Sequence, residues 1–334
     1  MARIEELFSE LDKGVENLKT AQKQLKVYRQ AILKHAFEGK LTAQWREENK
    51  DLLESPETLN KRIQLERNKQ YAQQHLEWES NGKQSSKPGM LKSPLKLSTE
   101  QLATLPMLPA SWSWARVEEF AEKVTDGEHI TPKRVKDGFY LLSARNIQNG
   151  YLSLFDVDYV PIDEYNRIRK RCNPQAGDIL ISCSGSVGRV CRVPEGIDFV
   201  MVRSVALIKI QYLKKTSKFY EYLFQSPVLQ KQIESGKKAT AQANLFLEPI
   251  KNLRIILCSD AEKIEIIKEL ETCLSVIDQM EKIINNSLQK SASLRQAILK
   301  KAFSGQLVPQ DPNDEPASIL LERIRSSRKN KNHQ

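Results

Sequence analysis

One segment occurs twice in this chain, and the duplication constrains the fold more than any other feature. Residues 29–41 read RQAILKHAFEGKL and residues 295–307 read RQAILKKAFSGQL, with ten identities in thirteen positions. The two copies stand 266 residues apart, which is a whole number of heptads. Two similar elements therefore bracket the sequence between them.

Apolar residues at heptad spacing lead into both copies, which predicts two long helices. We expect these helices to form an antiparallel coiled coil. The helices should end at Phe37 and Phe303, because Gly39 and Gly305 follow where a left-handed cap residue belongs. One copy alone would indicate an ordinary coiled coil. Two copies that end at the same kind of glycine cap favour helices that act as a spacer of fixed length and carry a duplicated docking surface. The expected seam consists of Ile4, Leu7, Leu11, Gly14, Leu18, Ala21, Leu25, Tyr28 and Ile32, and of Leu270, Cys273, Ile277, Met280, Ile284, Ser287, Ser291, Leu294 and Ile298.

The patterning between the helices changes after Leu105 to short runs rich in β-branched residues, separated by turn signals such as Asn149–Gly150. The fold class is therefore α+β, with one globular domain flanked by the two long helices. We expect strands at 113–121, 140–142, 154–160, 178–183, 187–193, 199–201, 205–210 and 253–257, and helices at 162–171 and 217–234.

The remaining segments are polar. Residues 55–79 have a helical pattern, residues 80–96 have the Ser, Lys, Gly and Pro of a flexible linker, and a short helix is expected at 317–325. Leu59, Arg62, Ile63 and Arg67 weakly match Leu320, Arg323, Ile324 and Arg328, so the arm could be duplicated as well. The expected organisation is a first repeat helix (1–50), an arm with a linker (51–104), a globular domain (105–258), a second repeat helix (259–307) and a short helix with a basic tail (308–334).

Composition limits the class of protein. The formal net charge of +10 fits a polyanionic partner, although solvated lysine-rich helices alone would produce the same excess. The sequence has no apolar run that could span a bilayer and no leader at Met1, so we expect a cytoplasmic protein without membrane contact. Five cysteines without a C-x-x-C pair indicate buried reduced thiols and no metal site.

No set of residues in the sequence indicates catalysis. The chain lacks the N/D-P-P-F/Y motif of amino-methyltransferases, and it has no acidic pair followed by lysine of the kind found in nucleases. The glycine cluster Ser184–Gly188 lacks the Gly-Lys-Ser/Thr of a phosphate-binding loop, so we expect a tight turn between two strands there. We therefore expect no enzyme activity and no cofactor in this chain.

Hydrogen-bond donors concentrate instead in the loops of the globular domain. Arg and Lys read guanine, Asn and Gln read adenine, and Lys, Ser and Thr commonly hold phosphates. Any single loop could be an ordinary surface turn, but the set favours double-stranded DNA. The candidate DNA-binding residues are His129, Thr131, Lys133, Arg134, Arg145, Asn146, Ser184, Ser186, Arg189, Arg203, Ser204, Lys237, Lys238, Gln242 and Asn244.

The chain resembles the DNA-specificity subunits of type I restriction–modification systems. The resemblance covers nearly the whole sequence except residues 80–96, and the motifs occur in the family's order. They are the duplicated helix end, LTAQW (41–45), LPASW (108–112), TDGEHITP (125–132), LLSARNI (141–147), GDILIS (177–182) with GSVG (185–188), and AQANL (241–245).

One departure from the family pattern has consequences for assembly. Family members usually carry two target-recognition domains that alternate with two long helices, whereas this chain has helix, one domain and helix. The resemblance therefore implies a half-sized subunit that forms a homodimer and reads a split palindrome. It also implies modification subunits that bring S-adenosylmethionine and methylate adenine N6. A restriction subunit that uses ATP and Mg would be a further partner.

The resemblance places partner docking on the repeated helix ends, where Phe37 and Phe303 should present matching apolar surface. Replacing both with Asp should abolish the complex and leave the fold intact. Two other hypotheses stay open: a stand-alone dimeric DNA-binding regulator, and a fragment that exchanges with a two-domain specificity subunit. The expected docking residues are Arg29, Gln30, Phe37, Gly39, Leu41 and Trp45, and Arg295, Gln296, Phe303, Gly305 and Leu307.

Overall fold

The computed structural model describes residues 2–83, 97–237, 243–309, 313 and 315–331. The chain divides into two compact units. Unit 1 comprises Met1–Val27 and Val276–Gln334, and unit 2 comprises Tyr28–Ser275. The predicted linker at 80–96 lies outside the described residues from residue 84 onward, and residues 80–83 complete a helix and its turn.

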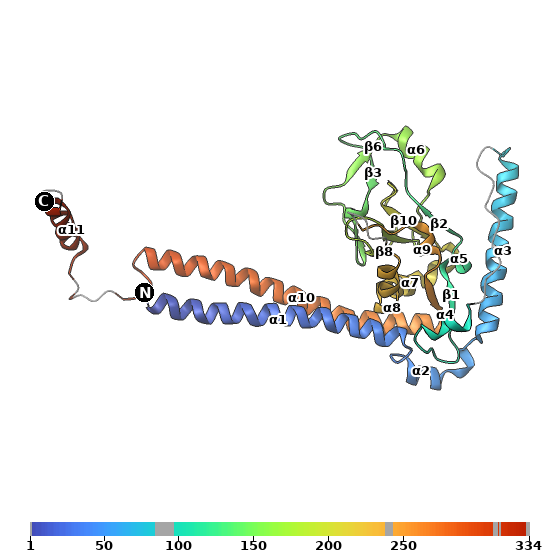
Figure 1. The fold of residues 1–334 in the computed structure, drawn as a ribbon, viewed down its shortest axis with the longest axis horizontal. Helices are drawn as coiled ribbons and strands as arrows, with labels where there is room; N and C mark the ends of the chain where they lie inside the picture. Colours follow the sequence, from blue (N-terminus) through green and yellow to red (C-terminus); the bar gives the residue numbers. More distant parts are fainter. Residues whose placement is uncertain (1, 84–96, 238–242, 310–312, 314, 332–334) are drawn as a thin grey trace. The chain divides into compact units, whose positions relative to one another are not determined.

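Unit 1 contains a pair of antiparallel helices, formed by the first part of α1 (Ala2–Phe37) and the last part of α10 (Asp260–Phe303) (Figure 1). Gln22 donates to the Asn285 side chain at 3.0 Å, and Arg295 pairs with Asp12 and lies 4.6 Å from the Phe8 ring centroid. Residue numbers rise along one helix as they fall along the other. The predicted antiparallel pair is confirmed, and it forms within one chain.

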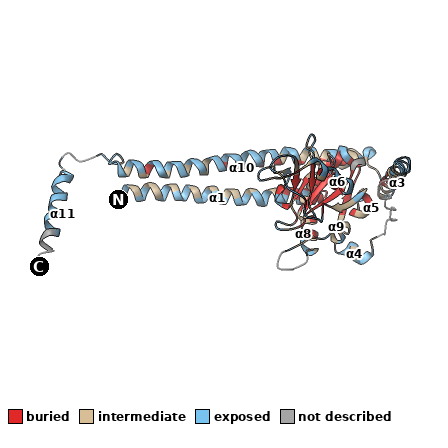
Figure 2. Ribbon diagram, turned by 90° about the horizontal axis from the view of Figure 1, so that it is seen from above, coloured by how far each residue is buried: buried red, intermediate tan, exposed pale blue. Residues whose placement is uncertain are grey.

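The predicted seam holds in part. Ile277, Ile284 and Ile298 of α10 are buried, whereas Met280 and Leu294 are 48% and 52% exposed. In α1, the predicted seam residue Gly14 is exposed, and the next residue, Val15, is half-buried instead. Two helices bury only one flank of each other, so the outer apolar positions stay in solvent (Figure 2).

Both repeat copies end in the same local structure. Gly39 has a φ of +72°, the Lys40 N–H donates to the His35 carbonyl at 3.0 Å, and the Gly39 N–H donates to the Ala36 carbonyl at 3.1 Å. The second copy repeats this Schellman pattern, with a φ of +71° at Gly305. The predicted helix ends are therefore confirmed.

The globular part of unit 2 is a mixed α+β domain, as predicted. Its main sheet has the order β2-β10-β7-β8, formed by Lys123–Asp126, Val205–Lys209, Ile179–Ser182 and Val190–Arg192. A second sheet has the order β6-β3-β9, formed by Asp158–Val160, Phe139–Leu142 and Phe199–Met201. Two short pairs complete the strands: β1 (Ser113–Arg116) with β11 (Arg254–Leu257), and β4 (Ile147–Gln148) with β5 (Tyr151–Leu152).

Several helices of unit 2 pack against these strands. Helix α6 (Ile162–Arg171) packs Tyr165 and Ile168 against β3, β6 and β9, and has the bounds that the sequence predicts. The other helices are α2 (Ala43–Glu48), α3 (Pro56–Ser80), α4 (Thr99–Ala103), α5 (Val117–Phe120), α7 (Ser217–Gln225), α8 (Pro227–Ser235) and α9 (Leu247–Lys251), with 3₁₀ turns at Lys50–Leu52, Ala144–Asn146 and Gln211–Thr216. Helices α5 to α9 pack against the strands, and α3 packs against α5. In unit 1, α11 spans Ala317–Lys331 and is longer than predicted.

Four predicted elements are wrong in their extent. The expected strands at 154–160 and 187–193 shorten to β6 (Asp158–Val160) and β8 (Val190–Arg192), because turns at 155–156 and 187–188 precede them. The expected strand at 113–121 ends at Arg116, and α5 follows because the Glu119 carboxylate accepts the Arg116 N–H at 3.1 Å. The expected helix at 217–234 breaks at Ser226, because Pro227 restricts the residue before it to extended backbone. Strand β2 was missed in the sequence, because its run of KVTD is short and largely polar.

Candidate nucleic-acid interface

Backbone hydrogen bonds join the polar loops of the globular domain, although the loops are distant in the sequence. The Arg203 N–H donates to the Glu128 carbonyl at 2.9 Å, and the Ala144 N–H donates to the Ser204 hydroxyl at 3.0 Å. Gly127 permits this approach, because a Cβ there would stand 2.1 Å from the Met201 carbonyl oxygen. The loops at 127–134, 143–146 and 203–204 therefore lie side by side.

The glycine turn joins the same group of loops. The Cys183 N–H donates to the Ser204 carbonyl at 2.8 Å, and a β-bridge links Ser184 to Asn244. Residues 184–188 make the tight turn between β7 and β8 that the sequence predicts, and the antiparallel register pairs Ile181 with Val190. We call the loops at 127–134, 143–146, 183–189 and 203–204 the donor face.

Most of the predicted DNA-binding side chains on these loops are accessible. His129, Thr131, Lys133, Arg134, Arg145, Ser186 and Arg203 are exposed, and Ser184, Arg189, Lys237 and Asn244 are half-buried. Lys237 pairs with Glu234 in the same helical turn. Lys238 and Gln242 lie outside the described residues.

Asn146 and Ser204 both make hydrogen bonds within the turns, and their role as DNA contacts stays a prediction. Asn146 is fully buried, accepts the Ser143 N–H at 2.9 Å and donates to the Ser153 carbonyl at 3.0 Å. The Ser204 hydroxyl accepts the Ala144 N–H. Asn146 has no exposed surface for a base, because its amide is used to shape the turn that presents Arg145.

Acidic partners hold the edge of the donor face in place. His129 Nε2 lies 2.8 Å from Asp126 Oδ2, and Arg171 donates to Asp126 Oδ1 at 3.0 Å. Glu128 is buried and pairs with Arg167 at 2.8 Å. Burial alone would raise the pKa of Glu128, but the Ile130 N–H and Arg167 hold it below the usual carboxyl value.

Arg167 and Arg171 are cations beside the donor face that were not among the predicted DNA-binding residues. They lie on α6, whose last turn contains Arg169, Lys170 and Arg171. This cluster of basic residues was the sequence signal that could have identified the helix as a candidate DNA-binding segment. A helix was expected at these residues, but only the tertiary contacts with Asp126 and Glu128 place it next to the loops.

The two repeat ends have different surroundings, which corrects the prediction of matching docking surfaces. Phe37 is fully buried, with its ring 5.3 Å from Phe219 of α7, whereas Phe303 is 89% exposed. Gly39 is buried beside Pro109, and Arg295 is engaged by Asp12. Leu41, Trp45, Arg29 and Leu307 are half-buried, and Gln30, Gln296 and Gly305 are exposed.

A buried carboxylate fastens the first repeat end to the start of α10. Glu262 accepts from Thr42 at 2.9 Å, from Arg46 Nε at 2.8 Å and from Trp112 Nε1 at 2.7 Å. Arg46 also lies 5.2 Å from the Trp112 ring centroid. Residues Thr42–Arg46, Trp112 and Glu262 therefore join three segments of unit 2 at one point.

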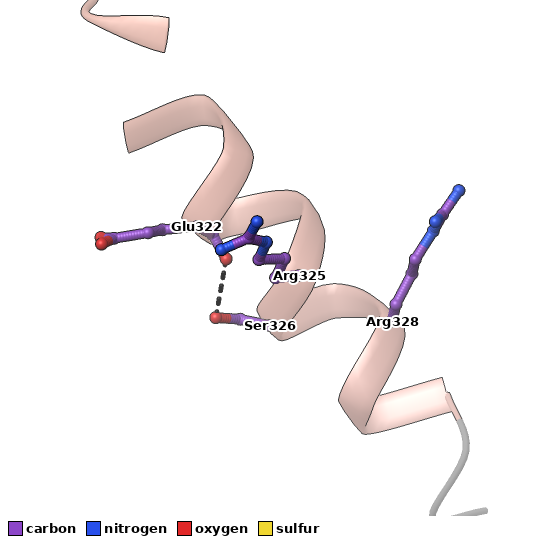
Figure 3. A pocket seen from close by; sticks show the side chains of 4 residues that line it. All are labelled: Glu322, Arg325, Ser326 and Arg328. Carbon is purple, nitrogen blue, oxygen red and sulfur yellow. Dashed lines mark hydrogen bonds between the residues drawn. The ribbon is translucent and has the colours of Figure 1, made fainter. Parts of the chain in front are cut away.

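The described residues contain no group of three or more His, Cys, Asp or Glu side chains that could hold a metal ion. Burial raises the pKa of the Cys172 and Cys183 thiols to about 12. A surface hollow on α11 is lined by Glu322, Arg325, Ser326 and Arg328, which all come from one helix (Figure 3). Within the described ranges, no helix is long and apolar enough to cross a membrane.

Comparison with known proteins identifies relatives of this chain. A family model described as type I restriction modification DNA specificity domain matches residues 109–290, more than half of the chain. The specificity subunit of the type I restriction enzyme EcoBI from Escherichia coli is 32% identical over 202 residues, covering 58% of this chain and 42% of that protein. The EcoKI specificity subunit from Escherichia coli strain K12 is 26% identical over 226 residues, covering 63% and 48%.

A solved structure shares the fold. A chain from a structural study of complex assembly and conformational transition in the type I R-M system superposes with a TM-score of 0.53 at 14% identity, covering 92% of this chain and 58% of that one. This chain thus spans a little less than half the length of the EcoBI and EcoKI specificity subunits.

Proposed function

The chain belongs to the family of type I restriction–modification DNA specificity proteins, and from this premise we propose that it reads a DNA sequence and directs partner subunits to it. The observation that carries the proposal is the donor face, where loops from four parts of the sequence present exposed Arg, Lys, Ser and Thr side chains on one scaffold. Such side chains hold phosphates and read base edges in the grooves. In this proposal the partner subunits carry out the chemistry.

The partners in this proposal are modification subunits, which would bring S-adenosylmethionine, extrude an adenine and methylate its N6. A restriction subunit that uses ATP and Mg would be an additional partner. The docking surface is the second repeat end, because Phe303 and its neighbours Gln296 and Gly305 are accessible. Phe37 is excluded from this surface by its burial.

A homodimer would complete the layout of two recognition domains. In unit 1, Val276, Met280, Ile283 and Leu294 of α10 are 48–63% exposed, and their helical spacing places them on one face. A second copy that covers this apolar stripe would form a two-fold dimer. Such a dimer reads the same half-site twice in opposite orientation, so the target would be a split palindrome.

The test is to co-express the chain with a type I modification subunit from the same genome, purify the complex and sequence the DNA that it methylates. A stable complex that methylates adenine in a split palindrome supports the whole proposal. An asymmetric target would overturn the symmetric dimer. A chain that binds DNA alone and supports no methylation would instead be a regulator.

A charged substitution at the open repeat end tests the docking site. Phe303→Asp should abolish co-purification with the modification subunit and leave the melting temperature unchanged, because the side chain is exposed in the free chain. Gln279→Asp is the matched control, because it adds the same charge at an exposed polar position of α10. Undiminished co-purification of the Phe303 variant would place docking elsewhere.

A further inference from the structure

The turn between β5 and β6 presents an aromatic ring directly to solvent. Phe155 is 89% exposed, and the Asp156 side chain beside it is 70% exposed. The residues on either side, Leu154 and Val157, pack against the buried core that contains Leu142 and Phe199. Because both ends of the turn are anchored, the ring projects from a firm base.

The backbone of the turn is set for this projection. Asp156 has a φ of +55°, in the left-handed region that Asp adopts more readily than most residues. The chain therefore reverses over two residues, and both side chains point away from the core. A large exposed aromatic ring at such a tip gains nothing for the stability of the free chain.

Two arginines of the donor face are held beside this turn. Arg145 lies 3.5 Å from Asp156 and 3.1 Å from Asp158, and Arg134 also reaches Asp158 at 3.1 Å. Asp158 thus pairs with two arginines from separate loops. Asp156, the residue after Phe155, pairs with one of them, Arg145. The arrangement places an exposed apolar ring beside two arginines, each held in an ion pair with a carboxylate.

We propose that Phe155 is a DNA wedge that stacks on or between bases while Arg134 and Arg145 engage the flanking backbone or base edges. Apolar side chains inserted at a base step unstack it in part and kink the duplex, and the cations beside such a wedge hold the phosphates. Asp158 is a positioning residue, since it fixes the direction of both arginines. The inference rests on the proposed DNA-reading function and adds the element that deforms the DNA.

The experiment uses the full chain and a duplex recovered by binding from a random-sequence pool, with fluorophores at its two ends. Affinity, the salt dependence of affinity and the end-to-end distance are measured for the wild type and for Phe155→Ala. We expect binding to weaken about tenfold and the bend to be lost, with the slope of log affinity against log salt unchanged. Phe155→Trp should keep both the affinity and the bend.

Two further variants separate the wedge from its cations. Arg145→Ala should reduce the magnitude of the salt slope by about one, because one phosphate contact is lost. Asp158→Asn frees both arginines, so we expect stronger binding to unrelated duplexes and poorer discrimination of the selected one. Met107→Ala is the matched control, because Met107 is 93% exposed and distant in sequence from the turn.

The possible results differ for the two proposals. If the wild type binds no duplex, both the DNA-reading function and the wedge are overturned. If the wild type binds but Phe155→Ala binds and bends DNA equally well, only the wedge is overturned. A Phe155→Ala variant that binds DNA normally but no longer co-purifies with the modification subunit would assign the ring to a protein contact and also overturn the wedge.

Discussion

At the scale of single residues, Glu262 near the start of α10 holds three segments of unit 2 together. Its carboxylate is fully buried and accepts from Thr42, Arg46 and Trp112. Glu262→Ala would leave the Arg46 guanidinium without its partner in a largely buried site. We expect a loss of about 3–5 kcal/mol in the free energy of unfolding, measured by urea denaturation. Glu47→Ala removes an exposed pair with Lys50 and should change little, so equal losses in the two variants would contradict this role.

Glu221 is a buried carboxyl group whose charge should reduce stability at neutral pH. Burial raises its pKa, and the Arg192 N–H, which it accepts at 3.0 Å, acts in the opposite direction. A carboxyl group whose pKa is higher in the folded state than the unfolded pKa of about 4.3 stabilises the folded state at pH values below the unfolded pKa. That stabilisation is lost as the pH rises through the folded-state pKa. Glu221→Gln should therefore be more stable than the wild type at pH 7 and equal to it near pH 4. Thermal unfolding at both pH values checks this, and a difference that does not change with pH would contradict it.

At the scale of elements, the two repeat copies form a natural matched pair. Phe37 and Phe303 follow the same local sequence and precede the same cap, yet one is buried against Phe219 and the other is in solvent. Phe37→Ala should cost about 3–5 kcal/mol of unfolding free energy, because it leaves a cavity. Phe303→Ala should stay within about 0.5 kcal/mol of the wild type. Similar losses for both, measured by denaturant unfolding, would show that the second end is also packed.

At the scale of the whole molecule, the exposed stripe on α10 predicts self-association. Met280→Glu combined with Ile283→Glu should convert dimers to monomers in sedimentation or light scattering, because charges would enter an apolar contact. The helix content and melting temperature of a monomeric unit should change little, since both side chains are already exposed. Glutamate at Gln289 and Ser293, two exposed polar positions on another face of α10, is the control. Unchanged dimers in the stripe variant would place the symmetric contact elsewhere.

The features that the sequence by itself determined are local. The helix ends at Phe37 and Phe303 follow from a glycine two residues later, because the left-handed cap needs only that residue and the preceding turn. The bounds of α6 and the turn at 184–188 follow from short-range patterns in the same way. The family resemblance rests on motifs in order and needed no coordinates.

The tertiary structure alone decided which of these local features are accessible. Phe37 is buried by Phe219, which stands 182 residues later, and no pattern near either repeat distinguishes it from Phe303. Asn146 has the residue type of a base reader, but its neighbours Ser143 and Ser153 take its hydrogen bonds. Burial and pairing depend on contacts between distant segments, whereas caps, turns and helical periodicity depend on neighbours along the chain. For that reason the elements could be predicted from the sequence, and the exposed set of binding residues could not.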